Sequence, residues 1–317
     1  MSVDRVATSA QTALFLAQIQ RAGSALDQTQ TQIASGKNAT TYAGFGNQTQ
    51  VLTATIAAGA RNSAYTTATT FASTQTDLQD TQLTTLASLS ADLKKAVSDA
   101  VANNDGTTLM AQVQSIFEQA TSILNSKDAN GDYLYSGGKT DTPPVAVNSL
   151  SDLAALPSVS DAFANGDIKK SVQVADGVSV SYGLTASDVG TGLMQALKDI
   201  ASFDAGASGN FDAASTLTAA QSTFLGGAIT QATTVNSDLN AATAANGYVS
   251  NQLTNAQTQQ SSLDTLYKGF VSNIQDTDMA KAATQLSLNQ VQLQAALQVT
   301  AGLNQLSLLN YLPVSGN

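Results

Sequence analysis

Apolar residues near the start of the chain recur every three or four positions, the spacing of one helix face. Four of these residues are large, and a glycine and a glutamine complete the series: Leu16, Ile19, Gly23, Leu26, Gln30 and Ile33. Gly36 follows the series and suits the left-handed conformation that often ends a helix. We therefore predict a first long helix that ends at Gly36.

Two further helices are predicted in the first half of the chain. The earlier one carries Leu86, Leu89, Leu93, Val97 and Val101. It ends at residues 103–106, where Asn-Asn-Asp-Gly is a strong turn signal. The later one carries Leu109, Val113, Ile116, Ala120 and Ile123.

A second helical flank is predicted to begin near residue 215. Its apolar residues, with one glutamine among them, keep the same spacing at Val249, Leu253, Ala256, Gln260, Leu263, Tyr267, Phe270 and Ile274. Asp278 is placed to cap a final helix, because aspartate side chains accept from the first free amides. One stripe of that helix holds Leu288, Val291, Ala295, Val299, Leu303 and Leu306, and an adjoining stripe holds Leu286, Leu293 and Leu297.

The final helix has a wide apolar face, which needs more than one packing partner. One expected partner is the first helix of the same chain, with Leu16, Ile19, Leu26 and Ile33 against the Leu288–Leu306 stripe. Neighbouring subunits are the others. The predicted assembly interface is therefore Leu16, Ile19, Leu26, Ile33, Leu286, Leu288, Val291, Leu293, Val299, Leu303 and Leu306.

The middle of the chain has a different pattern. Three of the four prolines lie there, at positions 143, 144 and 157. Valines alternate with polar residues on both sides of Asp176 and Gly177, which predicts a β-hairpin. Residues 133–135 are a second strand candidate, residues 193–200 a short helix, and residues 204–215 a loop.

Composition removes several function classes. The 317 residues include no cysteine, histidine or tryptophan, and Glu118 is the only glutamate. Thiolate nucleophiles, imidazole bases and ordinary zinc sites are thereby excluded. The net charge is -10 with only 11% charged residues, which disfavours nucleic-acid binding. We expect no enzyme and no cofactor.

Two short motifs have plain explanations. Asp128, Asn130 and Asp132 have the spacing that opens a calcium loop, but Tyr133 follows where glycine is needed and no glutamate closes the loop. A polar turn is the simpler interpretation. Gly190-Thr191-Gly192 lacks the third glycine of a dinucleotide-binding motif, so we predict a turn before a helix.

The start of the chain lacks the plan of a signal peptide, so if the protein is exported, the route does not use an ordinary cleavable signal. No stretch approaches the roughly 18 apolar residues that span a bilayer. We therefore expect no membrane insertion.

Both ends of the chain resemble the flagellin family. Residues 26–37 resemble that family's N-terminal helix with its Ser-Gly-Lys ending, and Arg61-Asn62 with Tyr65 resembles the segment that follows. Residues 276–283 resemble the Asp-x-Asp-Met-Ala signature that precedes a Leu/Gln/Ala helix. Within the family, residues 131–144 and the tail 306–312 resemble the hook–filament junction proteins.

The resemblance implies a subunit of the bacterial flagellum, outside the cell, that joins hook to filament. Its partners would be copies of itself and other axial proteins, namely hook-associated protein and flagellin. An export chaperone would be a further partner. The alternatives are a flagellin of the bulk filament and, more distantly, a non-flagellar helical surface assembly protein.

The predicted fold is mainly α. Long helices from both chain ends would form a coiled-coil or bundle rod, with a small α+β domain in the middle of the chain. The expected division has three parts. Residues 1–36 plus 276–317 are a terminal coiled-coil assembly domain, 37–127 plus 216–275 a helical bundle, and 128–215 the small α+β outer domain.

Overall fold

The computed structural model describes the backbone of residues 3–309 and the side chains of residues 10–302. The chain forms two compact units. Unit 1 comprises residues 1–60 and 264–317, and unit 2 comprises residues 61–263. Unit 1 therefore combines two segments that are far apart in the sequence, whereas unit 2 is one continuous segment.

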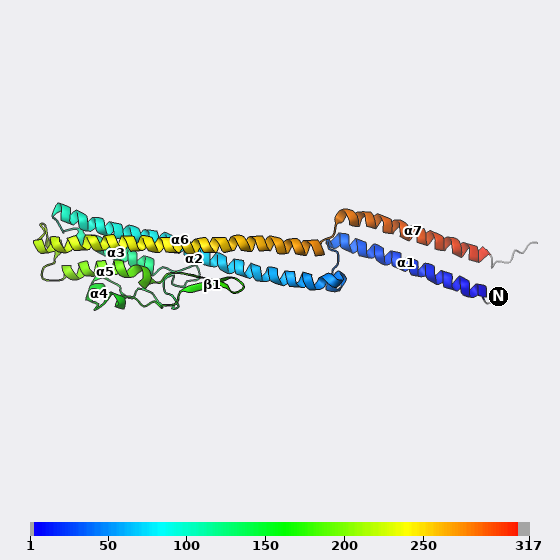
Figure 1. The fold of residues 1–317 in the computed structure, drawn as a ribbon, viewed down its shortest axis with the longest axis horizontal. Helices are drawn as coiled ribbons and strands as arrows, with labels where there is room; N and C mark the ends of the chain where they lie inside the picture. The colour runs from blue at the N-terminus through cyan, green and yellow to red at the C-terminus, as the bar shows by residue number, and fades with distance from the viewer. Residues whose placement is uncertain (1–2, 310–317) are drawn as a thin grey trace, which may run out of the picture. The chain divides into compact units, whose positions relative to one another are not determined.

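Unit 1 contains the helices of both chain ends (Figure 1). They are α1 (Val3–Ser35) and α7 (Met279–Leu309), with the short 3-10 helix η1 (Tyr42–Gln48) between α1 and α2. The first turns of α2 (Thr49–Asn103) and the last turns of α6 (Ala219–Gln275) complete the unit.

Unit 2 contains most of α2 and α6 and every element between them. These elements are α3 (Leu109–Leu124), α4 (Leu150–Ala155), η2 (Val159–Ala162), β1 (Lys170–Ala175), β2 (Val178–Tyr182), α5 (Ala186–Asp204) and η3 (Phe211–Ala213). Helix α2 ends where predicted, because Asn104 adopts a left-handed φ of 53°. A capping box begins α5, in which Thr185 and Asp188 exchange hydrogen bonds of 3.2 Å.

The core of unit 2 joins helices from both halves of the chain with the segment between them. It includes Leu93 of α2, Phe117 of α3, Leu193 of α5 and Leu225 of α6, each less than 2% exposed. Residues 134–162 contribute further members, among them Tyr135, whose pKa is raised by burial. Helices α3 and α5 are the most clearly amphipathic, and their apolar faces are buried in this core.

Helices α2 and α6 pair antiparallel, and polar side chains make the contacts that fix their register. Asn62 donates to the carbonyl of Gln260 at 2.8 Å, and Asn246 donates to that of Thr76 at 2.9 Å. Further along, Ser90 donates to the carbonyl of Ala232 at 3.0 Å. These carbonyls use a second lone pair, so no helix hydrogen bond needs to break.

The hairpin of β1 and β2 packs on the α2 and α6 pair. Val172 faces Val180 across the ladder, and Gly177 makes the turn with a φ of 72°. The valines of one face lie against Ala72 and Leu253. Tyr65 donates to the Asp176 carboxylate at 2.6 Å, and this bond raises the pKa of the tyrosine.

The mainly helical fold, the pairing of helices from both ends and the central hairpin are confirmed. The strand predicted at residues 133–135 is wrong, since Tyr133 makes only an isolated bridge to Lys127. Helix α4 was not predicted. The three-part division remains a prediction; residues 128–215 lie in unit 2, and many of their side chains share its core.

The turn predicted at residues 190–192 is also wrong, because both glycines lie within α5. Added Cβ atoms would lie 2.8 Å from Leu124 at Gly190 and 3.2 Å from Val235 at Gly192. The glycines therefore allow α5 to pack closely on α3 and α6.

Substituting a core leucine tests the role of α5. We expect Leu193→Ala to lower the free energy of unfolding by about 2–5 kcal/mol, because it leaves a cavity among rigid neighbours. Leu78→Ala, at a position 38% exposed on α2, should cost about 1 kcal/mol or less. Urea denaturation measures both values, and equal losses would contradict the assigned core.

Candidate assembly interface

Helices α1 and α7 pair antiparallel within unit 1 (Figure 1). The inner seam is the set of residues at three/four spacing that are least exposed on the two helices. On α1 it comprises Phe15, Ile19, Ala22, Leu26, Thr29 and Ile33. On α7 it comprises Ala282, Leu286, Asn289, Leu293, Ala296 and Thr300. The alternation of three and four is the knobs-into-holes pattern of a coiled coil.

A polar pair is the most buried part of the inner seam. Thr29 is 4% exposed and Asn289 is 3% exposed. The Asn289 amide donates to the Thr29 hydroxyl at 2.9 Å and to the carbonyl of Ala25 at 3.1 Å, and it accepts from Gln285 at 2.9 Å. A satisfied polar pair inside a coiled coil favours one register, because sliding would leave the amide buried without partners.

The joint is the place where residues 36–38 meet residues 274–277. The amide of Asn38 donates to the carbonyl of Gln275 at 2.7 Å, and that of Thr277 donates to the carbonyl of Gly36 at 2.9 Å. The Asn38 side chain donates to the carbonyls of Ile274 and Asp276 and accepts from the Thr277 hydroxyl. Several hydrogen bonds therefore connect the two segments of the joint, whose residues are exposed or half-buried.

The predicted helix boundaries beside the joint are confirmed. Gly36 adopts a left-handed φ of 67° directly after α1. Asp278 precedes α7, and its carboxylate accepts from the amides of Ala280 at 3.0 Å and Lys281 at 3.1 Å. Two of the segments that resemble the flagellin family, residues 26–37 and 276–283, thus meet at the joint and form the helix ends beside it.

The predicted interface residues divide into two groups. Ile19, Leu26, Ile33, Leu286 and Leu293 are half-buried and belong to the inner seam. Leu16, Leu288, Val291 and Val299 are 56%, 49%, 62% and 50% exposed. The side chains of Leu303 and Leu306 lie outside the described residues. The expected packing of the Leu288–Leu306 stripe on α1 is therefore wrong for Leu288 and Val291, since the adjoining stripe takes that place.

The outer stripe of α7 is defined as Leu288, Val291, Ala295 and Val299. With 3.6 residues per turn, it points roughly a third of a turn away from the inner seam. Between its far end and α1 lies a groove of about 560 Å³, bordered by Phe15, Arg21, Ala295 and Val299 among others. Exposed apolar side chains on a nearly uncharged helix are typical of a surface that another molecule covers.

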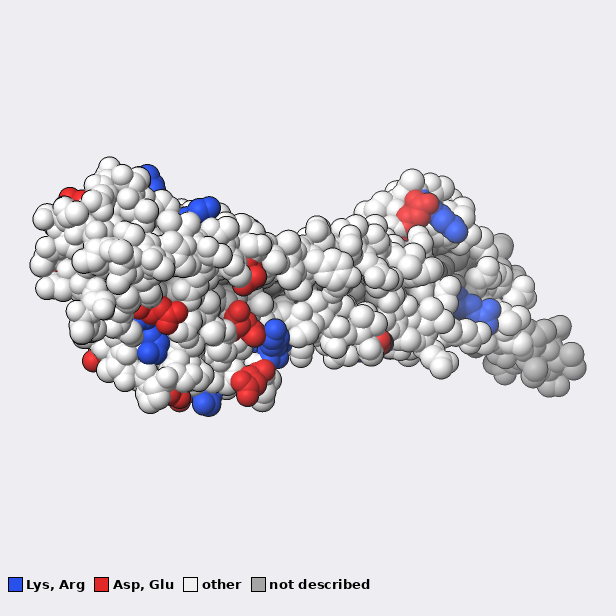
Figure 2. Space-filling view, turned by 60° about the vertical axis from the view of Figure 1, so that its left-hand side comes forward, with Lys and Arg blue, Asp and Glu red and all other residues white. Residues whose placement is uncertain are grey.

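Charged groups are sparse on this protein. On the face drawn in Figure 2, small groups of acidic and basic side chains are separated by wide uncharged areas. Between residues 279 and 302, Lys281 is the single charged residue of α7. No described residues gather into a set of three potential metal ligands, and Asp128 instead accepts from the amides of Asn130 and Asp132 in a polar turn.

The helices of the described region include none with the length and apolarity to cross a bilayer.

Residues 223–312 match the family described as the bacterial flagellin C-terminal helical region. The match covers most of α6 and continues through the joint into α7. The resemblance to the flagellin family of structural proteins that we expected from the sequence is thereby confirmed. No curated protein matches the chain by sequence.

Solved structures of hook-associated proteins have a similar fold. A Vibrio parahaemolyticus protein described as a flagellar hook-associated protein is 17% identical with a TM-score of 0.59; the match covers 72% of this chain and 97% of that one. FlgL of Xanthomonas campestris is 13% identical with a TM-score of 0.54, covering 69% and 98%. FlgL of Bacillus cereus is 12% identical with a TM-score of 0.52, also covering 69% and 98%.

The joint can be tested through Asn38. We expect Asn38→Ala to weaken the joint by about 1 kcal/mol, because three partly solvated hydrogen bonds are lost. Hydrogen exchange at the amides of Asn38 and Thr277 should then be roughly fivefold faster. Asn38→Asp should be at least as harmful, since it turns a carboxylate toward two carbonyls.

Asn47→Ala is the matched control, at an exposed position in η1. It should leave exchange at both amides unchanged. Unaltered exchange in Asn38→Ala would show that the side chain does not hold the joint.

Proposed function

We propose that this chain is a structural subunit of the bacterial flagellum that joins the hook to the filament. The observation that carries the proposal is the extent of the fold match, which includes nearly the whole length of three hook-associated proteins. A flagellin-type C-terminal helical region at residues 223–312 supports a place among the axial proteins.

Assembly in this proposal uses the outer stripe of α7. Within the chain, α1 and α7 bury their inner seam and leave Leu288, Val291 and Val299 about half exposed or more. Full burial of such a side chain contributes about 1.5–3 kcal/mol, so partial burial of three of them in each subunit interface is a substantial gain. Neighbouring copies of this chain, hook-associated protein and flagellin are the proposed partners, and a chaperone is a further one before export.

The proposed location is outside the cell, in the flagellum. A junction subunit must present two unlike surfaces, one toward the hook and one toward the first flagellin layer. An identical contact repeated from subunit to subunit would instead extend without limit.

A deletion strain tests the junction role. Electron microscopy should find hooks without filaments, and flagellin should accumulate in the culture medium. The second candidate is a filament flagellin, which the match to the flagellin C-terminal region favours. Growth of the purified protein into micrometre filaments, or labelling along the whole filament, would decide for that candidate.

The outer stripe can be tested separately with Val291→Asp. The isolated chain should fold as before, because position 291 is 62% exposed. Incorporation into the flagellum should fail, since assembly would bury an unpaired carboxylate. Fractionation of sheared flagella measures incorporation.

Gln259→Asp adds the same charge at an exposed position of α6 in unit 2, and it should incorporate normally. Normal incorporation of Val291→Asp would remove the outer stripe from the proposed interface.

A further inference from the structure

Unit 2 buries several polar side-chain atoms that have no hydrogen-bond partner among the described residues. They are Gln79 Oε1, Gln82 Oε1, Thr121 Oγ1, Tyr135 OH and Gln260 Oε1. A buried acceptor without a partner has lost its hydration and gained nothing in return. Such atoms in native proteins therefore usually have a hydrogen-bond partner, and ordered water is a common one.

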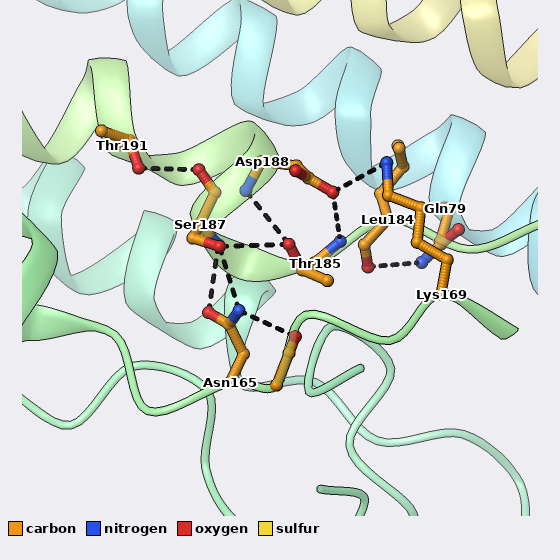
Figure 3. A network of polar contacts seen from close by, with 9 residues as sticks. Gln79, Asn165, Lys169, Leu184, Thr185, Ser187, Asp188 and Thr191 are labelled. Atoms are coloured by element: carbon orange, nitrogen blue, oxygen red, sulfur yellow. Dashed lines mark hydrogen bonds and ion pairs between the residues drawn. The ribbon is translucent and has the colours of Figure 1, made fainter. Parts of the chain in front are cut away.

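Gln79 is the clearest case. The residue is 1% exposed and lies on the face of α2 that meets the chain entering α5. Its Nε2 atom donates to the carbonyl of Leu184 at 3.4 Å (Figure 3). That contact fixes which end of the amide is the nitrogen, because exchanging the two atoms would place two acceptors together.

A small cavity lies beside Gln79. Its volume is about 10 Å³, close to the least space that holds one water molecule. Its lining comes from α2, from the turn after Leu134, from residues 168–170 at the start of β1 and from the strand exit, which is the segment of residues 183–185 between β2 and α5. The lining residues include Gln75, Gln79, Gly137, Lys170, Gly183 and Thr185.

The neighbouring polar groups already have partners of their own. Gln75 donates to the Asp128 carboxylate at 2.7 Å and accepts from Lys170 at 3.3 Å. Lys169 pairs with the carboxylate of Asp188 at 3.2 Å (Figure 3). Among the side chains that line this cavity, Gln79 Oε1 is the buried polar atom without a hydrogen-bond partner among the described residues.

The chemistry of the cavity selects its ligand. The ligand must donate a hydrogen bond, because Gln79 Oε1 can only accept. Lys169 and Lys170 line the same cavity and disfavour a cation. The volume admits a single non-hydrogen atom. A neutral donor of one heavy atom is water.

We propose that this cavity is a binding site for one ordered water molecule that donates to Gln79 Oε1. The water connects α2 with the strand exit at Gly183–Thr185, next to the capping box that begins α5. It complements the polar network of Asn165, Thr185, Ser187 and Asp188 that Figure 3 shows on the other side of Leu184. The site thereby adds a polar contact between α2 and the segment that leads into α5.

The test compares the number of long-lived internal waters in variants of the full chain. Oxygen-17 magnetic relaxation dispersion counts such waters in solution. Gln79→Leu removes the acceptor and fills the cavity, so the count should fall by one relative to the unsubstituted chain. Gln259→Leu makes the same replacement at an exposed position of α6 and should leave the count unchanged.

An unchanged count in a folded Gln79→Leu variant overturns the proposal. Circular dichroism establishes that the variant is folded. If it is not, a crystal structure of the unsubstituted chain decides the question. A water oxygen within hydrogen-bond distance of Gln79 Oε1 supports the site, and a protein donor on that atom overturns it.

Discussion

The pairing of α1 with α7 depends on a core that lies elsewhere in the chain. Thr29 and Asn289, the centre of the inner seam, are 260 residues apart. Closing so long a loop costs entropy, and few seam residues are fully buried in return. The stabilising apolar contacts are those of unit 2, where Leu93, Phe117, Leu193 and Leu225 meet. Because α2 and α6 are paired, and α1 and α7 lie next to them in the sequence, this pairing lowers the entropy cost of bringing α1 and α7 together.

Helices α2 and α6 pair with each other through small and polar residues. Alanine and threonine give α2 and α6 weakly amphipathic surfaces, which would not select one alignment by hydrophobic burial. Asn62, Ser90 and Asn246 instead donate to single carbonyls on the opposite helix. A shift by one residue would bury these donors without partners, so specificity comes from the cost of misalignment. The same reasoning applies to Asn289 in the inner seam.

Much of the fold could be predicted because its boundaries depend on local chemistry. Gly36, Asp278 and the Asp176-Gly177 turn act through backbone conformation or capping, which neighbouring residues suffice to define. Residues 190–192 could not be assigned in this way, because their glycines serve contacts with distant side chains. The choice between the two stripes of α7 was also beyond the sequence. Both stripes have helical spacing. The polar residue Asn289 lies at the centre of the inner seam, so a search for apolar residues at helical spacing does not find this seam as one continuous stripe.

The division of α7 into two stripes links the fold to the proposed assembly. A helix with one apolar face would bury it on α1 and leave a polar surface, which gives a neighbouring subunit nothing to cover. Here Leu286 and Leu293 take the contact with α1, and Leu288 and Val291 remain available. In the proposed assembly, further subunits cover the outer stripe, and the terminal helices then gain apolar burial that the inner seam with its polar pair of Thr29 and Asn289 does not provide. The stability of the terminal helices is thus expected to be a property of the assembly, with the single chain supplying the register through its joint and its seam.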